Sequence, residues 1–233
     1  MGFNPNRNFN EPIFKTESKE VEKFVIIAFE GAETEHQYFS HIKKEFKPNG
    51  ITIACIKRGK GEENSSSPTK VAQTIIDIIE DKERLTKIKN ECPHDFDDSY
   101  DLFWIVVDRE KQESKKVNLT NAIKTCKEHN IQVSLTNPAF EFWLLLHFDI
   151  SKYSRSDLLE NKKTSEQSKR FLETALISEI GQYNKSKLDT KFITFKNISL
   201  AVEQEVKFEN DLDKIIDKLG SNVGNLMKEI LGI

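Results

Sequence analysis

Three carboxylates come directly after buried strands in this sequence and have the spacing of a metal site. Glu30 follows the apolar run 24–29, and Asp108 and Glu110 follow the apolar run 102–107. The carboxyl ends of parallel strands meet at one edge of a sheet, and residues two apart point to one side of an extended segment. Oxygen ligands suit Mg²⁺ or Mn²⁺, so these acids are predicted metal ligands. The alternative is that they are exposed acids at the starts of loops.

A divalent ion held by these acids would act on phosphate. It can polarise a phosphoryl oxygen, lower the pKa of bound water and stabilise a leaving oxygen. A basic, glycine-bearing loop supplies Lys57, Arg58 and Lys60, which either contact the phosphates of a substrate or belong to a flexible connector. Arg109 lies between the metal acids and either binds a phosphate bidentately or turns away to pair with a helix acid. Phosphoryl chemistry is therefore predicted.

Alternating strands and helices must position these residues. Apolar, partly β-branched runs predict strands at residues 24–29, 51–56, 102–107 and 131–135. Segments with helical periodicity separate them and are long enough to cross over between parallel strands. The predicted fold is a mainly parallel α/β sheet flanked by helices.

The chain divides into three predicted segments. Residues 1–20 are polar and aperiodic and are expected to form a flexible arm. Residues 21–150 are expected to form the α/β core, which ends in a strongly apolar helix at 139–148 that Asn137 and Pro138 are expected to cap and begin. Residues 151–233 are lysine-rich and mostly helical, and their apolar stripes are expected to pack on the core.

Composition narrows the class of protein. The chain has 233 residues, of which 37% are hydrophobic and 31% charged, and its formal net charge of -3 gives no global attraction to nucleic acid. Any such binding therefore needs a local basic face. No apolar run is long enough to span a bilayer and the first residues lack the apolar centre of a secretory signal, so a cytoplasmic protein without membrane contact is expected. Three cysteines without CxxC spacing argue against a zinc site.

Three segments, at residues 29–35, 107–110 and 137–148, resemble successive motifs of the RloB-like family. The resemblance implies a divergent topoisomerase-primase (TOPRIM) fold, in which Glu30, Asp108 and Glu110 hold Mg²⁺ for breaking phosphodiesters. Glu110 departs from the Asp that family members often carry there, which changes the reach of this ligand. The resemblance also implies a role in anti-phage defence or restriction-linked loci, beside a partner ATPase of the ABC or structural-maintenance (SMC) type.

The last of these segments contains Glu141 and His147. Glu141 falls in the first turn of the expected helix, where it is predicted to be a fourth ligand or to orient a base. His147 lies on a different helical face and is either catalytic or a hydrogen-bonded core residue. The predicted catalytic set is thus Glu30, Asp108, Glu110, Glu141 and His147.

The sequence predicts a Mg²⁺- or Mn²⁺-dependent nuclease acting on DNA or RNA, transfer RNA included, with Glu30 as general base or ligand. Its rival is a non-catalytic regulatory module that uses the same sheet edge to bind a nucleotide or a partner ATPase. The oligomeric state stays open, with a homodimer among the options.

Overall fold

The computed structural model describes residues 23–31, 33–48, 50–56, 67–89, 101–110, 113–163 and 169–233. The predicted N-terminal arm lies outside these residues. In order along the chain, the elements are β1 (Lys23–Phe29), α1 (Thr34–Phe46), β2 (Ile51–Ile56), α2 (Pro68–Glu80), α3 (Lys82–Lys89), β3 (Leu102–Asp108), α4 (Glu113–Glu128), β4 (Gln132–Asn137), α5 (Phe140–Leu145), η1 (Ile150–Lys152), α6 (Arg155–Glu160), α7 (Phe171–Ile180), η2 (Thr190–Phe192), α8 (Phe195–Glu205), α9 (Leu212–Ile215), β5 (Gly220–Ser221) and α10 (Val223–Leu231).

The strands form one sheet in the order β2-β1-β3-β4-β5. The pairs β1·β2, β1·β3 and β3·β4 are parallel, and β5 joins β4 antiparallel through Thr136 and Ser221. The predicted fold class, a mainly parallel α/β sheet flanked by helices, is confirmed, and it is consistent with a TOPRIM-like arrangement. The carboxyl ends of β1, β3 and β4 therefore meet at one edge.

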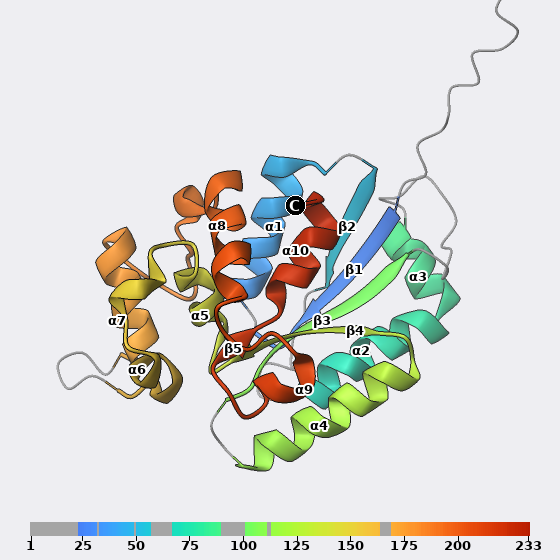
Figure 1. Ribbon diagram of the computed structural model, residues 1–233. Helices are drawn as coiled ribbons and strands as arrows, with labels where there is room; N and C mark the ends of the chain where they lie inside the picture. The colour runs from blue at the N-terminus through green and yellow to red at the C-terminus, as the bar shows by residue number, and fades with distance from the viewer. Residues whose placement is uncertain are drawn as a thin grey trace, which may run out of the picture.

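Helices cover both faces of the sheet, with α2 and α4 on one side and α1, α5, α8 and α10 on the other (Figure 1). Alternate residues of β1 point to opposite faces of the sheet and belong to different cores. Phe24, Ile26 and Ala28 belong to the core under α2 and α4, whereas Val25 and Ile27 belong to the opposite one. Burial on both faces explains why the strands read as continuous apolar runs.

The core on the α1 side contains residues from both ends of the chain. Val25 of β1 and Phe39 of α1 share it with Leu176 of α7 and Met227 of α10. Helices α7, α8 and α10 thus contribute to the core on this face of the sheet, whereas Ile215 of α9 belongs to the opposite core. Among the residues that the structure describes, none of the helices has the length and apolar character that crossing a membrane requires.

The segment around Asn137 differs from its prediction. Asn137 is the last residue of β4 and precedes a cis peptide bond to Pro138, and the N-cap position of α5 is Ala139. The Asn137 side-chain amide donates instead to the carbonyl of Ile215, at 2.7 Å. The predicted capping role of Asn137 is therefore wrong, because a partner distant in sequence takes its side chain.

The apolar helix expected at 139–148 is also shorter, since α5 ends at Leu145. Beyond it the backbone bonds shorten to three-residue steps, from the N–H of His147 to the carbonyl of Leu144 and from the N–H of Phe148 to that of Leu145. This tightened turn leads the chain out toward η1.

Candidate active site

The ends of β1 and β3 bring the first two predicted acids together. Glu30 follows β1 directly and its backbone N–H donates to the carbonyl of Val106 at 2.9 Å, which continues the sheet by one residue. Its side chain is buried, and Oε2 accepts a 3.2 Å hydrogen bond from the backbone N–H of Asp108. The parallel register therefore places Glu30 and Asp108 at the same sheet edge, as the sequence predicts.

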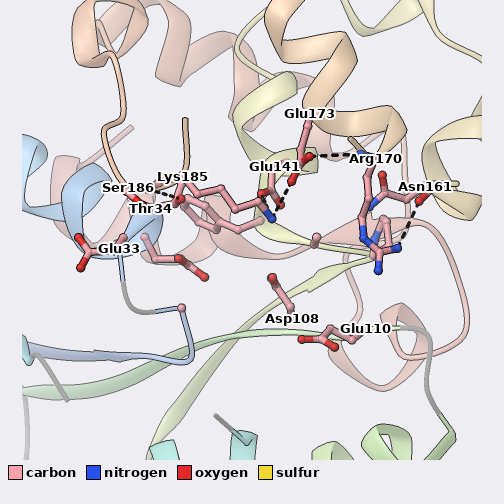
Figure 2. A pocket seen from close by; sticks show the side chains of 15 residues that line it. Glu33, Thr34, Asp108, Glu110, Glu141, Asn161, Arg170, Glu173, Lys185 and Ser186 are labelled. Carbon is pink, nitrogen blue, oxygen red and sulfur yellow. Dashed lines mark hydrogen bonds and ion pairs between the residues drawn. The ribbon is translucent and has the colours of Figure 1, made fainter. Parts of the chain in front are cut away.

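A pocket of about 440 Å³ opens above this edge. Figure 2 shows Asp108 and Glu110 on its lower side and Glu141, Glu173, Lys185 and Arg170 above them. Carboxylates dominate the described lining, which also includes two basic side chains. The acids are Glu33, Glu35, Asp108, Glu110, Glu141 and Glu173, and the bases are Arg170 and Lys185.

Burial and the repulsion of neighbouring carboxylates disfavour the charged forms of Asp108 and Glu35. Burial, followed by the charges of Glu35, Glu141 and Glu30, raises the pKa of Asp108 well above its usual value, although a hydrogen bond from the Phe140 N–H lowers it. Burial also raises the pKa of Glu35 to about 7, and the charges of Glu141 and Glu30 add to this rise. Two carboxylates at strand ends, Glu30 and Asp108, and two in the first turns of helices, Glu35 and Glu141, thus interact at one edge of the sheet.

Gly31 allows the Glu35 carboxylate to lie against the end of β1. A Cβ atom at position 31 would come within 1.9 Å of Glu35 Oε2 and 2.1 Å of Oε1. The sequence Glu30-Gly31 thus combines a carboxylate at the strand end with room for a second one from α1. Glu35, which the sequence analysis did not select, is a pocket residue as a result.

Glu110 lies in the left-handed region, with a φ of 38°. Its carboxylate forms an ion pair with Lys115 of α4, and its side chain is 42% exposed. Glu110 lines the pocket with Asp108, but in this structure its charge is compensated by a lysine.

Glu141 occupies the first turn of α5, as predicted, and is the centre of a polar network. Its Oε1 accepts a 3.0 Å hydrogen bond from the Tyr183 hydroxyl and lies 2.8 Å from Nζ of Lys185. The same Nζ lies 3.0 Å from Oε1 of Glu173. The Lys185 backbone is in turn held by α1, because its carbonyl accepts from Oγ1 of Thr34 at 3.1 Å. Burial by itself would lower the pKa of Lys185, but its pairing with Glu141 and Glu173 outweighs burial and raises that pKa.

His147 lies outside the pocket lining, 1% exposed within the core. Its Nδ1 is 3.1 Å from the carbonyl of Trp143, and its Nε2 is 3.1 Å from the hydroxyl of Tyr38. A carbonyl only accepts, so Nδ1 carries the proton and Nε2 accepts from Tyr38. Burial lowers the pKa of His147 to about 4, so the ring is neutral at physiological pH. This geometry favours the core alternative over a catalytic role.

Arg109 turns away from the pocket toward α9. Its Nε donates to the carbonyl of Ile216 at 2.7 Å, and its Nη1 donates to the carbonyl of Glu110. The guanidinium therefore binds the carbonyl end of a short helix, where unpaired acceptors favour a cation. A phosphate contact from Arg109 is not supported by this geometry.

The basic loop with Lys57, Arg58 and Lys60 lies outside the described residues, so its predicted contact with substrate stays a prediction.

The donors of the pocket suit a hard divalent cation in their chemistry. Oδ1 of Asp108 is buried and has no hydrogen-bond partner among the described residues, and burial together with the neighbouring carboxylates raises the pKa of Asp108. A bound cation would satisfy this oxygen and offset the repulsion. As the side chains stand, however, no three His, Cys, Asp or Glu residues of the described segments are grouped closely enough to hold a metal ion. Glu110, in its pair with Lys115, is the predicted ligand that would have to turn.

Several residues that line the pocket or contact its carboxylates were not predicted from the sequence. Tyr183 and Lys185 follow α7 in a segment without helical or strand periodicity, and they meet Glu141 only through the fold. Arg170 and Glu173 belong to the lysine-rich extension, where charge alone does not separate a pocket residue from a solvated one. Glu35 carried the one available signal, since it follows Glu30-Gly31 at the start of α1.

The comparisons with known proteins point to one family. The family model described as RloB-like protein matches residues 25–230, from β1 to α10. No curated protein and no solved structure matched the chain. Because the family match spans the sheet, the pocket and the helices that follow, the chain belongs to the RloB-like family.

Proposed function

We propose that this protein is a metal-dependent nuclease that hydrolyses phosphodiester bonds of DNA or RNA, transfer RNA included. The observation that carries the proposal is the group of carboxylates at the carboxyl edge of the sheet, where Glu30 contacts the backbone of Asp108 and the buried Asp108 Oδ1 is without a hydrogen-bond partner among the described residues. Ligand sites of open α/β sheets lie at this edge.

Glu30, Asp108 and Glu110 are the residues that would hold Mg²⁺ or Mn²⁺. Such an ion supplies Lewis acidity toward a phosphoryl oxygen and lowers the pKa of water. The Glu30 carboxylate accepts a hydrogen bond from the backbone N–H of Asp108. This bond fixes the relative position of two acids from different strands. The carboxylate of Glu141, paired with Lys185, lies on the opposite side of the same pocket. Because the sheet holds Glu30 and Asp108 in position before a substrate binds, their charges are preorganised for the reaction.

In the cell, the proposed nuclease acts as the effector of an anti-phage system together with a partner ATPase of the ABC or SMC type. Family membership supports this assignment, and the low net charge agrees with it, because a chain with a formal charge of -3 has little general affinity for nucleic acid. The ATPase would deliver or recognise the target. Nuclease activity is then expected to be low for the isolated chain and to rise when the ATPase is present.

The test is incubation of pure protein with DNA, messenger-like RNA and transfer RNA, with Mg²⁺, with Mn²⁺ and with EDTA, in the presence and absence of the ATPase. Asp108→Ala and Glu30→Gln should abolish cleavage. The matched control is Glu203→Gln, which removes one exposed acid of α8 away from the pocket. Metal-independent cleavage, or cleavage that survives both variants, would refute the proposal.

A second candidate is a non-catalytic module that binds a nucleotide or the ATPase at the same edge. It is favoured by the ion pairs of Glu110 with Lys115 and of Glu141 with Lys185, which compensate acids without a metal. This function predicts that Glu30→Gln leaves phage defence intact in cells, whereas the nuclease predicts that defence is lost.

A further inference from the structure

The pocket has a basic wall opposite its acidic floor. Both basic residues of the described lining, Arg170 and Lys185, come from the chain after residue 150, whereas Asp108 and Glu110 come from the end of β3. Figure 2 shows the Arg170 side chain pointing down from the start of α7 toward the side of the pocket where Glu110 lies. A phosphate that approaches the acids would therefore pass this wall.

The ammonium group of Lys185 is already ion-paired within the protein. Its ammonium is shared between Glu141 at 2.8 Å and Glu173 at 3.0 Å, so two carboxylates already compensate it. Binding a phosphate there would require breaking these pairs and leaving the buried Glu141 uncompensated, which is costly. Lys185 is thus a counter-ion of the pocket.

The Arg170 guanidinium is differently placed. Within the described segments it forms no ion pair, and its one hydrogen bond, from Nη1 to the carbonyl of Asn161, is 3.5 Å long. That length exceeds the usual range for an N–H donor, so the contact is weak. The planar fork of donors that makes arginine suited to phosphate is therefore uncommitted.

The backbone that carries Arg170 is, in contrast, firmly held. Its N–H donates to Oε2 of Glu173 at 3.2 Å, and its carbonyl accepts from the N–H of Thr174 at 3.0 Å. The next turn is fixed by the N–H of Leu172, which donates to Oδ1 of Asn161 at 3.0 Å. The backbone of Arg170 is thus held in place while its guanidinium is available to bind an anion.

We propose that Arg170 binds a backbone phosphate of the nucleic-acid substrate, next to the phosphate that meets the acids. The identity of the ligand rests on the proposed function. Arg170 would fill the role that the sequence suggested for Arg109, whose guanidinium is taken up by the carbonyls of Ile216 and Glu110. The lysine-rich extension would then supply substrate contacts as well as one wall of the fold.

The test measures binding separately from cleavage. In an Asp108→Asn background, the affinity for a short fluorescein-labelled single-stranded RNA or DNA is followed by anisotropy over a series of salt concentrations with Mg²⁺ present. Arg170→Gln should weaken binding roughly tenfold and lower the slope of log K against log salt by about 0.7, the value for one phosphate contact on a single strand. Arg170→Lys, which keeps the charge without the fork, should recover part of the affinity.

Arg84→Gln is the matched control, because Arg84 is an exposed arginine of α3 outside this pocket. Its affinity and salt slope should equal those of the parent. With Asp108 restored, Arg170→Gln should raise KM far more than it lowers kcat. Melting temperatures of all variants serve as the folding check.

The outcomes separate this inference from the proposed function. Cleavage by the wild type with equal KM, affinity and salt slope for Arg170→Gln would overturn the Arg170 assignment and leave the nuclease standing. Arg170-dependent binding without cleavage under any metal would support the assignment and refute the nuclease. Failure of the parent to bind either oligonucleotide would overturn the assignment.

Discussion

The backbone N–H of Asp108 donates a 3.2 Å hydrogen bond to Oε2 of Glu30, so one carboxylate holds the chain segment that carries the other. The bond joins the carboxyl ends of β1 and β3, which are paired in parallel. Glu30 therefore has a structural task that either protonation state can perform, since both retain an acceptor oxygen. A glutamine at this position keeps the acceptor and loses the charge.

The first prediction concerns Asp108 without metal. Its raised pKa means that folding disfavours the ionised form, so at neutral pH its charge reduces stability. Asp108→Asn should therefore be at least as stable as the wild type in EDTA. Mn²⁺ should raise the melting temperature of the wild type only, with a gain of about 2.7 kcal/mol when its concentration is about 100 times Kd. Calorimetry with and without Mn²⁺ measures both effects. If Asp108→Asn were markedly less stable than the wild type in EDTA, Asp108 would have a structural role.

The second prediction concerns the Glu141–Lys185 pair. Lys185→Met keeps the apolar stem but leaves the buried Glu141 without its cation, which should cost about 1–2 kcal/mol of unfolding free energy because Lys185 itself is half exposed. Adding Glu141→Gln should restore most of this loss, since the Tyr183 hydroxyl can still donate to the amide oxygen. Urea titrations of the single and double variants give the coupling energy.

Lys187→Met is the control for this cycle, because Lys187 is an exposed lysine of the same loop without an ion pair among the described residues. It should leave the unfolding free energy unchanged. Additive losses in the double variant would mean that Lys185 and Glu141 do not stabilise one another.

The third prediction separates structure from substrate binding at Arg109. Arg109→Met removes a buried donor from the carbonyl of Ile216 and should lower the unfolding free energy by about 1–3 kcal/mol. The metal-dependent rise in melting temperature should persist, because the acids remain. Arg84→Met, at an exposed site, should have neither effect. If Arg109→Met were as stable as the wild type but bound substrate more weakly, Arg109 would be a phosphate-binding residue and the structural role would be wrong.

The sheet and its acidic edge follow from local sequence, but the network above them does not. The bounds of the continuous apolar runs agree with those of β1, β2 and β3 to within one residue. Burial on both faces requires such runs, and a polar residue follows each strand where it leaves the core. Asn137, by contrast, takes its partner from Ile215, and Glu141 takes Lys185 and Tyr183. Each of these contacts depends on how the extension packs, and no periodicity within either segment reports it.

The last prediction uses a buried acid outside the pocket. Glu205 of α8 is 2% exposed, and its Oε1 accepts a 3.0 Å hydrogen bond from the N–H of Gly224 in α10. Burial raises the pKa of Glu205 from 4.5 to about 7, while hydrogen bonds from Gly224 and Ser221 and the charge of Lys228 oppose the rise. The folded state therefore prefers the protonated acid.

The sign of the pH effect follows from this direction. The stabilising contribution of protonated Glu205 is fully present below about pH 4.5 and is lost as the pH rises through about 7. At about 1.4 kcal/mol for each pKa unit, the loss reaches about 3 kcal/mol. Glu205→Gln should thus match the wild type near pH 4 and exceed its unfolding free energy by up to about that amount at pH 8 or above. Glu203→Gln, an exposed neighbour on the same helix, should show no such divergence, and parallel wild-type and Glu205→Gln curves in urea titrations across this pH range would contradict a raised pKa at Glu205.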